Sequence, residues 1–431
     1  MNQLKLFLPC AAGVEDLLAE EAHRLTGLQG EDLRVLRGGV LMRASWRDAQ
    51  LLNLHSRLAQ RVLIELSHTE YRSEQNLYDA ASQVAWEIWF TPKQSFKVEI
   101  TSQHSPLTSL NFAALKIKDA IADRFRHKQG VRPDVDTRWP DIRIYAHLTT
   151  EHATLYMDTS GEPLFKRGWR EDKGEAPLKE TLAAAMIAAS EWDGTAPLYD
   201  PCCGSGTIAI EAAQIACNIA PGSLRRFAFE KLLPFQPHVW TGLLEQARAA
   251  EHPPVAEIFG SDVAHRMVDF AMRNAERAGV AGVVQFRGGD ALQRMPPAKA
   301  GVMLVNPPYG ERIAVAGVAG VASVLAGRQG ARSARGGPAG RGARDQRPPP
   351  PVMENVQSRE VALTDDGGDF FPKLATHWKK NYAGWTAWVL TPDLKLPGRM
   401  RLKESRRVPM WNGPIECRLF RFDMVAGSAR G

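Results

Sequence analysis

The chain has 431 residues, 44% of them hydrophobic, which is enough for two or three domains with sizeable cores. Lys and Arg outnumber Asp and Glu by 54 to 48, and the net charge of +6 favours a polyanionic partner. The five cysteines are odd in number and show no metal-ligand spacing, which argues against a metal site or a disulfide framework and favours a reducing cytoplasm. The chain has no run of about 18 apolar residues and no signal sequence, so we expect neither a membrane span nor secretion.

Short strands and helices alternate over the first 160 residues. The apolar face of one helix, which includes Val14, Leu18 and Leu25, ends near Gly27. The other predicted elements are strands over 4–8, 40–42, 62–66 and 96–100, helices over 49–58, 77–89 and 111–125, and a hairpin over 142–148 and 153–157. This order predicts an α+β region with mixed small sheets, in which nothing is typical of a catalytic site.

A turn-rich, basic connector follows, from Asp158-Thr159-Ser160-Gly161 to Arg170. Its composition favours a solvated linker. The alternative is an RNA contact, because Lys166, Arg167 and Arg170 stand beside two aromatic residues and thus combine charge with stacking. We retain these three cations as candidate RNA-binding residues.

A glycine loop joins a strand over 198–200, which ends at Asp200, to a helix over 208–220. The loop reads Pro201-Cys202-Cys203-Gly204-Ser205-Gly206-Thr207, and its glycines let a ligand approach the backbone and the helix N-terminus. It lacks both the Walker ending and the full GxGxxG pattern, so ATP and NAD are disfavoured and another nucleotide-type ligand is favoured. With no His in the loop, its two cysteines are predicted to pack rather than to react.

Two more carboxylates follow predicted strands. Asp262 comes after the strand over 257–260 and Asp290 after the strand over 283–286. A carboxylate at such a position often binds ribose hydroxyls, although either Asp could instead cap the following helix. Residues 224–255 lie between the loop and Asp262 and are predicted to be either an insertion that shapes the substrate side or a surface excursion.

The apolar strand over 301–305 ends at Asn306-Pro307-Pro308-Tyr309. Two prolines cannot continue a strand ladder because neither offers an N–H, so the strand stops where open α/β sheets bind ligands. One group that such a turn could position is the exocyclic amine of a nucleic-acid base, which is a poor nucleophile because its lone pair is delocalised into the ring. The Asn306 side-chain oxygen and the Pro307 carbonyl could accept hydrogen bonds from such an amine while Tyr309 stacks on the base, swung out of its helix.

The last part of the chain changes composition twice. Residues 313–367 are rich in Arg, Gly and Pro and are predicted to be a disordered insertion, either merely solvated or in nonspecific contact with RNA. A helix over 371–382 and strands over 386–390 and 417–422 follow. The basic stretch 395–407 is predicted to be part of a hairpin whose charges protect a sheet edge or bind RNA. Its candidate RNA-binding residues are Arg399, Arg401, Lys403 and Arg406.

The glycine loop and the Asn-Pro-Pro-Tyr motif together resemble those of the class I S-adenosylmethionine-dependent amino-methyltransferases, over roughly 165–425. The resemblance implies a Rossmann-like α/β domain over 161–425 with S-adenosylmethionine as cofactor. It implies that the loop binds the cofactor's methionine part, that Asp262 holds the ribose hydroxyls and that Asp290 holds the adenine amine. The cofactor-binding set is then Asp200, Pro201, Cys202, Gly204, Ser205, Gly206, Thr207, Asp262 and Asp290, and the catalytic set is Asn306, Pro307, Pro308 and Tyr309.

The first half resembles the ferredoxin-like plus THUMP arrangement of RNA-modifying enzymes, here over 1–45 and 46–160. The similarity lies in Phe112–Ile121 and in Asp158–Gly168, which resemble the bacterial large-subunit ribosomal RNA guanine-N2 methyltransferases. Many members continue into a second methyltransferase domain, which we do not expect here. The implied substrate is a guanine of 23S rRNA. The alternatives are adenine-N6 methylation of nucleic acid and a noncatalytic RNA-binding or ribosome-assembly protein.

Overall fold

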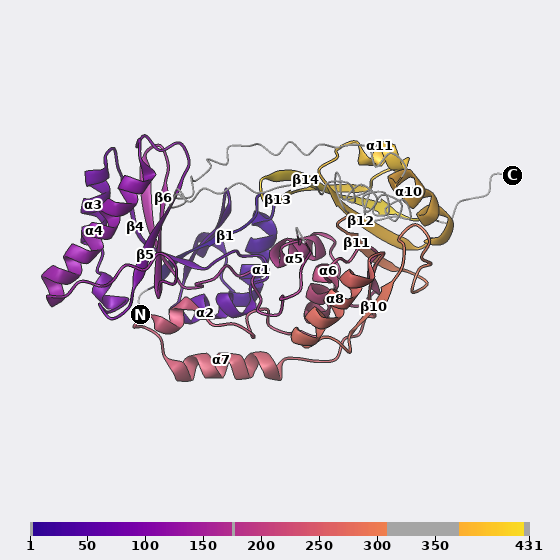
Figure 1. The fold of residues 1–431 in the computed structure, drawn as a ribbon, viewed down its shortest axis with the longest axis horizontal. Helices are drawn as coiled ribbons and strands as arrows, with labels where there is room; N and C mark the ends of the chain where they lie inside the picture. Colours follow the sequence, from indigo (N-terminus) through magenta and orange to yellow (C-terminus); the bar gives the residue numbers. More distant parts are fainter. Residues whose placement is uncertain (1–2, 175–176, 308–369, 426–431) are drawn as a thin grey trace, which may run out of the picture.

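Two seven-stranded sheets organise the part of the chain that the computed structural model describes, residues 3–174, 177–307 and 370–425 (Figure 1). The first sheet has the strand order β2-β3-β1-β4-β7-β6-β5, and the second has the order β10-β9-β8-β11-β12-β14-β13. The confirmed architecture is therefore an α+β half followed by a Rossmann-like α/β half. None of the described helices is long and apolar enough to cross a membrane.

The first sheet mixes parallel and antiparallel strands as predicted, but it is one continuous sheet rather than several small ones. β4 pairs with β1 through Leu63 and Ile64 and with β7 along most of its length, which joins two modules edge to edge. A sequence pattern shows alternation within a strand but not which strands pair. The elements are β1 (Leu4–Pro9), α1 (Glu15–Thr26), β2 (Leu33–Leu36), β3 (Gly39–Ala44), α2 (Trp46–His55), β4 (Leu63–Glu70), α3 (Glu74–Gln83), β5 (Phe96–Ser102), α4 (Leu110–Gln129), β6 (Ile142–Leu148) and β7 (His152–Asp158).

The second sheet is parallel from β10 to β12 and ends in the antiparallel strands β14 and β13. Its chain order reverses between β8 and β11, which creates the switch point where such sheets bind ligands. The elements are α5 (Glu180–Ala189), β8 (Leu198–Asp200), α6 (Thr207–Ala216), α7 (Pro237–Ala249), β9 (Ile258–Asp262), α8 (His265–Arg277), β10 (Val284–Gly288), β11 (Gly301–Val305), α10 (Phe370–Asn381), β12 (Trp385–Thr391), α11 (Leu396–Met400), β13 (Arg406–Asn412) and β14 (Ile415–Asp423).

The basic stretch 395–407 differs from the predicted hairpin arm. It forms the short helix α11 and a turn, and β13 begins only at Arg406. Pro397 explains the difference, because a proline fits the first turn of a helix but cannot donate to a strand ladder. The predicted insertion 313–367 lies outside the described residues.

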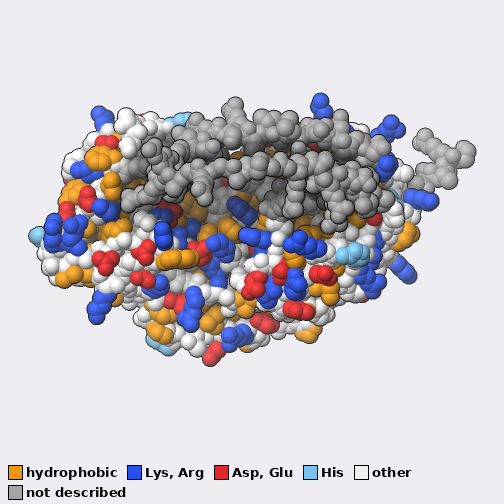
Figure 2. All heavy atoms as spheres, viewed as in Figure 1, with side chains coloured by type: hydrophobic (Ala, Val, Ile, Leu, Met, Phe, Trp, Pro, Cys, Tyr) orange, Lys and Arg blue, Asp and Glu red, His pale blue; other side chains and the backbone are white. Residues whose placement is uncertain are grey.

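Charges of both signs alternate over the part of the surface that Figure 2 shows for described residues. There, Lys and Arg side chains are interspersed with Asp and Glu over the lower part of the molecule. Such mixing lowers the long-range field of the face, so RNA contacts have to be argued from individual residues.

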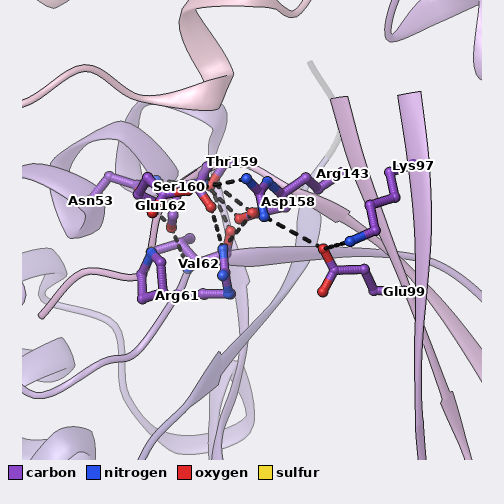
Figure 3. A network of polar contacts seen from close by, with 12 residues as sticks. Asn53, Arg61, Val62, Lys97, Glu99, Arg143, Asp158, Thr159, Ser160 and Glu162 are labelled. Atoms are coloured by element: carbon purple, nitrogen blue, oxygen red, sulfur yellow. Dashed lines mark hydrogen bonds and ion pairs between the residues drawn. The ribbon is translucent and has the colours of Figure 1, made fainter. Parts of the chain in front are cut away.

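Much of the connector after β7 is buried, whereas its composition favoured a solvated linker. Thr159 and Ser160 both have fully buried side chains that bond to Asn53 of α2 and to Val62 before β4 (Figure 3). The Asn53 amide donates to Thr159 Oγ1 at 2.8 Å, and Ser160 Oγ donates to Asn53 Oδ1 at 2.6 Å. Turn-forming polar residues thus lock the two modules of the first sheet together.

Residues 224–255 form a surface segment whose first part packs on the first half, a contact that the sequence did not predict. Phe229 N–H donates to the Thr159 carbonyl at 2.9 Å, and its ring stands edge-on to the Trp46 ring at 6.5 Å. Arg225 donates to the carbonyls of Pro163 and Lys166. In Figure 1, α7 runs below α2, away from β10 to β12. This segment therefore connects the two halves of the chain.

Candidate active site

Four polar residues follow four adjacent parallel strands at one edge of the second sheet. Asp200 pairs with Gly260 across β8 and β9, and Asp262 at the end of β9 pairs with Gly288 of β10. β11 lies on the other side of β8 and is followed by Asn306. The register therefore brings Asp200, Asp262, Asp290 and Asn306 to the carboxyl edge, beside the switch point.

Glycine is required at the two loop positions for different structural reasons. Both have left-handed φ angles, +52° at Gly204 and +89° at Gly206. A Cβ on Gly206 would come within 3.0 Å of Ala271 and Phe286, so this glycine lets α6 pack on the sheet. A Cβ on Gly204 would meet nothing within 4 Å, so the backbone there faces open space that a ligand can occupy.

Asp262 is oriented by the glycine loop itself. Its Oδ2 accepts the Gly204 N–H at 3.0 Å and its Oδ1 accepts the Ala264 N–H at 2.9 Å. Each carboxylate oxygen retains lone-pair capacity, so the pair can accept from two neighbouring hydroxyls. Burial raises the pKa of this carboxyl.

Asp200 is 1% exposed and only partly satisfied. Its Oδ1 accepts the Cys202 N–H at 3.1 Å, and among the described residues the carboxylate has no other partner. Burial raises its pKa to about 8, and the nearby Asp262 carboxylate adds to the rise. A cationic ligand group would stabilise both carboxylates.

Asp290 lies at the start of a turn after β10. Its Oδ1 accepts the Leu292 N–H at 2.9 Å, and its carbonyl accepts the Arg294 N–H at 2.9 Å. Asp290 thus stabilises a turn rather than capping a following helix, because the described residues between β10 and β11 form no helix, and the second carboxylate oxygen remains available to a ligand.

The loop cysteines are not nucleophiles. Burial, and then the carboxylates of Asp200 and Asp262, raise the pKa of the Cys202 and Cys203 thiols well above the usual value. Both thiols stay protonated near neutral pH, so the loop offers packing and backbone groups rather than thiolate chemistry.

The motif after β11 is described only in its first half. Asn306 is half-buried and Pro307 is buried at the end of the strand. Pro308 and Tyr309 lie outside the described residues, so their predicted roles stay predictions.

Arg167, a candidate RNA contact, lies inside the protein. It is 1% exposed, and its guanidinium bonds Glu211 of α6 at 3.1 Å and the carbonyls of Leu164 and Arg57 at 2.8 Å each. Arg57 of the first half binds the same Glu211 at 3.2 Å. We therefore do not retain Arg167 as an RNA contact, because its donors hold the two halves of the chain together.

Arg170 is also engaged internally. Its guanidinium bonds Glu180 of α5 at 2.8 Å, the Leu178 carbonyl at 3.0 Å and Thr207 Oγ1 at 2.7 Å. Thr207 is the first residue of α6, so Arg170 connects the connector to the end of the glycine loop. This positioning role was missed from the sequence, which offered only a cation beside an aromatic residue.

The other basic candidates lie nearer the surface. Lys166 is exposed and pairs with Glu162, and Arg399 is half-buried and pairs with Asp393 at 3.1 Å. Arg401, Lys403 and Arg406 are exposed, and Arg406 pairs with Glu191.

Comparison with known proteins places this site in a family. Three family profiles match along the chain: the RlmL ferredoxin-like domain over 5–63, the THUMP domain over 71–158 and the RMKL-like methyltransferase domain over 167–319. The "Putative RNA methyltransferase slr0064" of Synechocystis sp. is 32% identical over 420 residues, which cover 97% of this chain and 96% of that protein. The chain belongs to the THUMP-containing, RMKL-like methyltransferases.

Other relatives are longer than this methyltransferase. The ribosomal RNA large subunit methyltransferase K/L of Psychromonas ingrahamii is 35% identical over 96% of the chain and 49% of its own length. The protein of the same name from Shewanella amazonensis is 34% identical over 98% of the chain and 54% of its own length. The chain therefore spans about half the length of these curated relatives.

Solved structures share the whole fold. SMU.472, described as "a putative methyltransferase complexed with SAH", has a TM-score of 0.78 at 26% identity and covers 99% of this chain and 100% of its own. A predicted N6-adenine-specific DNA methylase from Listeria monocytogenes has a TM-score of 0.76 at 26% identity, over 97% and 96% of the two chains. These matches confirm the predicted fold class.

Proposed function

We propose that this methyltransferase transfers a methyl group from S-adenosylmethionine to the exocyclic N2 amine of a guanine in 23S rRNA. The observation that carries the proposal is the row of Asp200, Asp262, Asp290 and Asn306 at the switch-point edge. The rRNA substrate is supported by the names of the relatives that match nearly all of the chain.

The residues at the edge fit the proposed cofactor. Asp262 would accept the ribose hydroxyls, Asp200 would face the methionine ammonium, and Asp290 would accept from the adenine amine. The open space at Gly204 lets the cofactor reach the backbone of the loop, which continues through Ser205 and Gly206 to Thr207. When bound, the cofactor supplies an electrophilic methyl group on its sulfonium.

The protein's own contribution is to position the amine. The Asn306 side-chain oxygen and the Pro307 carbonyl would accept hydrogen bonds from the two amine N–H groups and turn the nitrogen lone pair toward the methyl group. As the new N–C bond forms and the S–C bond breaks, the nitrogen would release one proton to water. Pro308 would stiffen this turn and Tyr309 would stack on the flipped base. No protein nucleophile is needed, in keeping with the protonated loop thiols.

We assign RNA binding to 1–45 and 46–160 and the chemistry to 161–425. The exposed cations Lys166, Arg401, Lys403 and Arg406 remain candidate phosphate contacts, and Arg399 can join them from beside α11. We infer that the protein acts in the cytoplasm, where rRNA is modified.

Methylation of rRNA from cells lacking the modification tests the proposal. Purified protein with labelled cofactor should yield N2-methylguanosine, identified by mass spectrometry after digestion. Asn306→Ala should lower the rate at least about 100-fold, because the amine loses a positioning acceptor, while cofactor affinity stays close to that of the wild type. Unchanged turnover in this variant would refute the proposed mechanism.

Adenine N6 is the second candidate target, favoured by the description of the Listeria monocytogenes structure. N6-methyladenosine in the same digest would establish it and exclude guanine. If calorimetry detects no cofactor binding, both enzymatic proposals fail and a noncatalytic RNA-binding role is favoured.

A further inference from the structure

A pocket with a mixed polar and apolar lining lies where three distant segments of the chain meet. Its cavity measures about 210 Å³. One wall is the turn after β1 together with Gln60, the second is the start of α5, and the third is the turn between β13 and β14. The lining residues that matter are Gln60, Lys179, Thr181, Trp411 and Asn412.

The pocket lies at the catalytic edge of the second sheet. The strand register places Arg407 of β13 level with Val305 of β11. Val305 pairs with Val389 of β12, Val389 pairs with Phe420 of β14, and Phe420 pairs with Arg407. β13 then continues for five residues to Asn412, so its turn projects beyond the edge that carries Asn306. Three strand spacings and a few residues of rise put this turn on the order of 20 Å from Asn306.

The first half forms the opposite wall by direct packing. Gly13 has a φ of +83°, and a Cβ there would come within 2.3 Å of the Pro409 carbonyl oxygen and 3.3 Å of the Trp411 ring. In Figure 1, β1 and α1 lie beside β13 and α5. The pocket is therefore a built junction between the RNA-binding half and the catalytic half.

Several polar residues line this pocket, and one of them, the exposed Lys179, has its ammonium 5.3 Å from the centre of the Phe165 ring. The Gln60 and Asn412 amides, the Thr181 hydroxyl and the Lys179 ammonium make no hydrogen bond or ion pair within the described ranges. Thr181 is 8% exposed and lines the pocket at the start of α5. Two amides, a hydroxyl, a cation and an indole are the groups that bind a base edge, a phosphate and a base face.

We propose that this pocket is an RNA subsite that holds one nucleotide flanking the methylated base. Trp411 stacks on the base, Gln60 and Asn412 bond its edge, and Lys179 pairs with a phosphate. The subsite rests on the proposed function, since it presumes that the chain binds RNA. The subsite anchors the RNA strand at the junction between the two halves while the target base reaches Asn306.

Binding measurements on pocket variants test this subsite. Trp411→Leu keeps an apolar contact with Gly13 but removes the stacking face, so the Kd for an rRNA fragment should rise about tenfold. Lys179→Met and Asn412→Ala should each raise it about threefold. Affinity for the cofactor and kcat at saturating RNA should match the wild type, because no pocket residue lies in the cofactor loop. Lys299→Met is the control: it removes an exposed charge just before β11, at the opposite edge of the sheet, and should change nothing.

The outcomes separate the two proposals. Wild-type RNA affinity in Trp411→Leu and Asn412→Ala, with unchanged melting temperatures, overturns the subsite even when guanine is methylated. Loss of cofactor binding in the same variants also overturns it, since the pocket would then act through the fold. Tight binding of guanosine monophosphate alone, unaffected by RNA, would make the pocket a site for free nucleotides instead. Failure of wild-type methylation, with RNA affinity still lowered by the variants, removes the proposed function and leaves the RNA site.

Discussion

Two buried aspartates at strand ends show how differently the two sheets use one side chain. Asp158 ends β7 and Asp200 ends β8, and each is 1% exposed with a pKa raised by burial. Asp158 is fully engaged, by Arg61 at 2.7 Å and by the N–H groups of Ser160 and Gly161 (Figure 3). Asp200 accepts one N–H within the described residues. A satisfied buried carboxylate holds the fold, whereas a partly satisfied one is poised for a ligand.

Glu211 gives the strongest test of this rule. It lies on α6, directly after the glycine loop, yet its carboxylate is fully paired with Arg57 and Arg167. Glu211→Gln removes the ion-pair partner that the buried Arg57 and Arg167 share, so the free energy of unfolding should fall by about 3–5 kcal/mol. Cofactor affinity, measured by calorimetry well below the melting temperature, should change less than about twofold. A large loss of affinity at normal stability would contradict the rule.

Asp200→Asn should have the converse effect. The variant removes the proposed partner of the methionine ammonium, so the Kd for the cofactor should rise about 100-fold. Stability to urea should be equal to or higher than that of the wild type, because a poorly solvated carboxyl is replaced by a neutral amide. Marked destabilisation would show that Asp200 serves the fold as Asp158 does.

Asp158→Asn completes the comparison. It leaves the Arg61 guanidinium without its ion pair, and unfolding should be easier by about 2 kcal/mol. Cofactor affinity should be unchanged in calorimetry. Chemical denaturation of the two variants side by side compares the aspartates directly.

The pH dependence of Asp200 gives the most specific effect. In the cofactor-free protein this carboxyl keeps its proton up to about pH 8, whereas the unfolded chain releases it near 3.8. Its contribution therefore lowers stability as pH rises from about 4 to 8. Cofactor binding favours the ionised form, so affinity should rise with pH by up to about tenfold per unit below 8, with release of a proton. Calorimetry in buffers of different ionisation enthalpy measures that proton, and Asp200→Asn should abolish it.

The sequence predicted those parts of the molecule that depend on local patterns. α1 ends before Gly27, whose φ of +73° requires a residue without a Cβ penalty, and the glycine loop stands between β8 and α6 as expected. The carboxyl edge followed from parallel strands, because their ends must share one side of the sheet.

Contacts between distant segments were not predictable in the same way. β2 was missed because Leu33–Leu36 is short and mostly exposed, and Arg167 was misjudged because its partner lies 44 residues further along. One signal was present: Glu211 is the only charge in the helix Thr207–Ala216. A lone charge in a helix that is otherwise apolar indicates a buried counter-ion and thus an arginine elsewhere.

The shared Glu211 also has a consequence for how a target nucleotide is selected. Arg57 and Arg167 join both halves to one carboxylate. We therefore expect a fixed distance between the RNA-binding half and the catalytic site, without a hinge between them. The conformational adjustment then falls on the RNA, which must span that fixed distance with a base turned outward. Substrates lengthened or shortened by one nucleotide between anchor and target should accordingly be methylated at the nucleotide that restores the span.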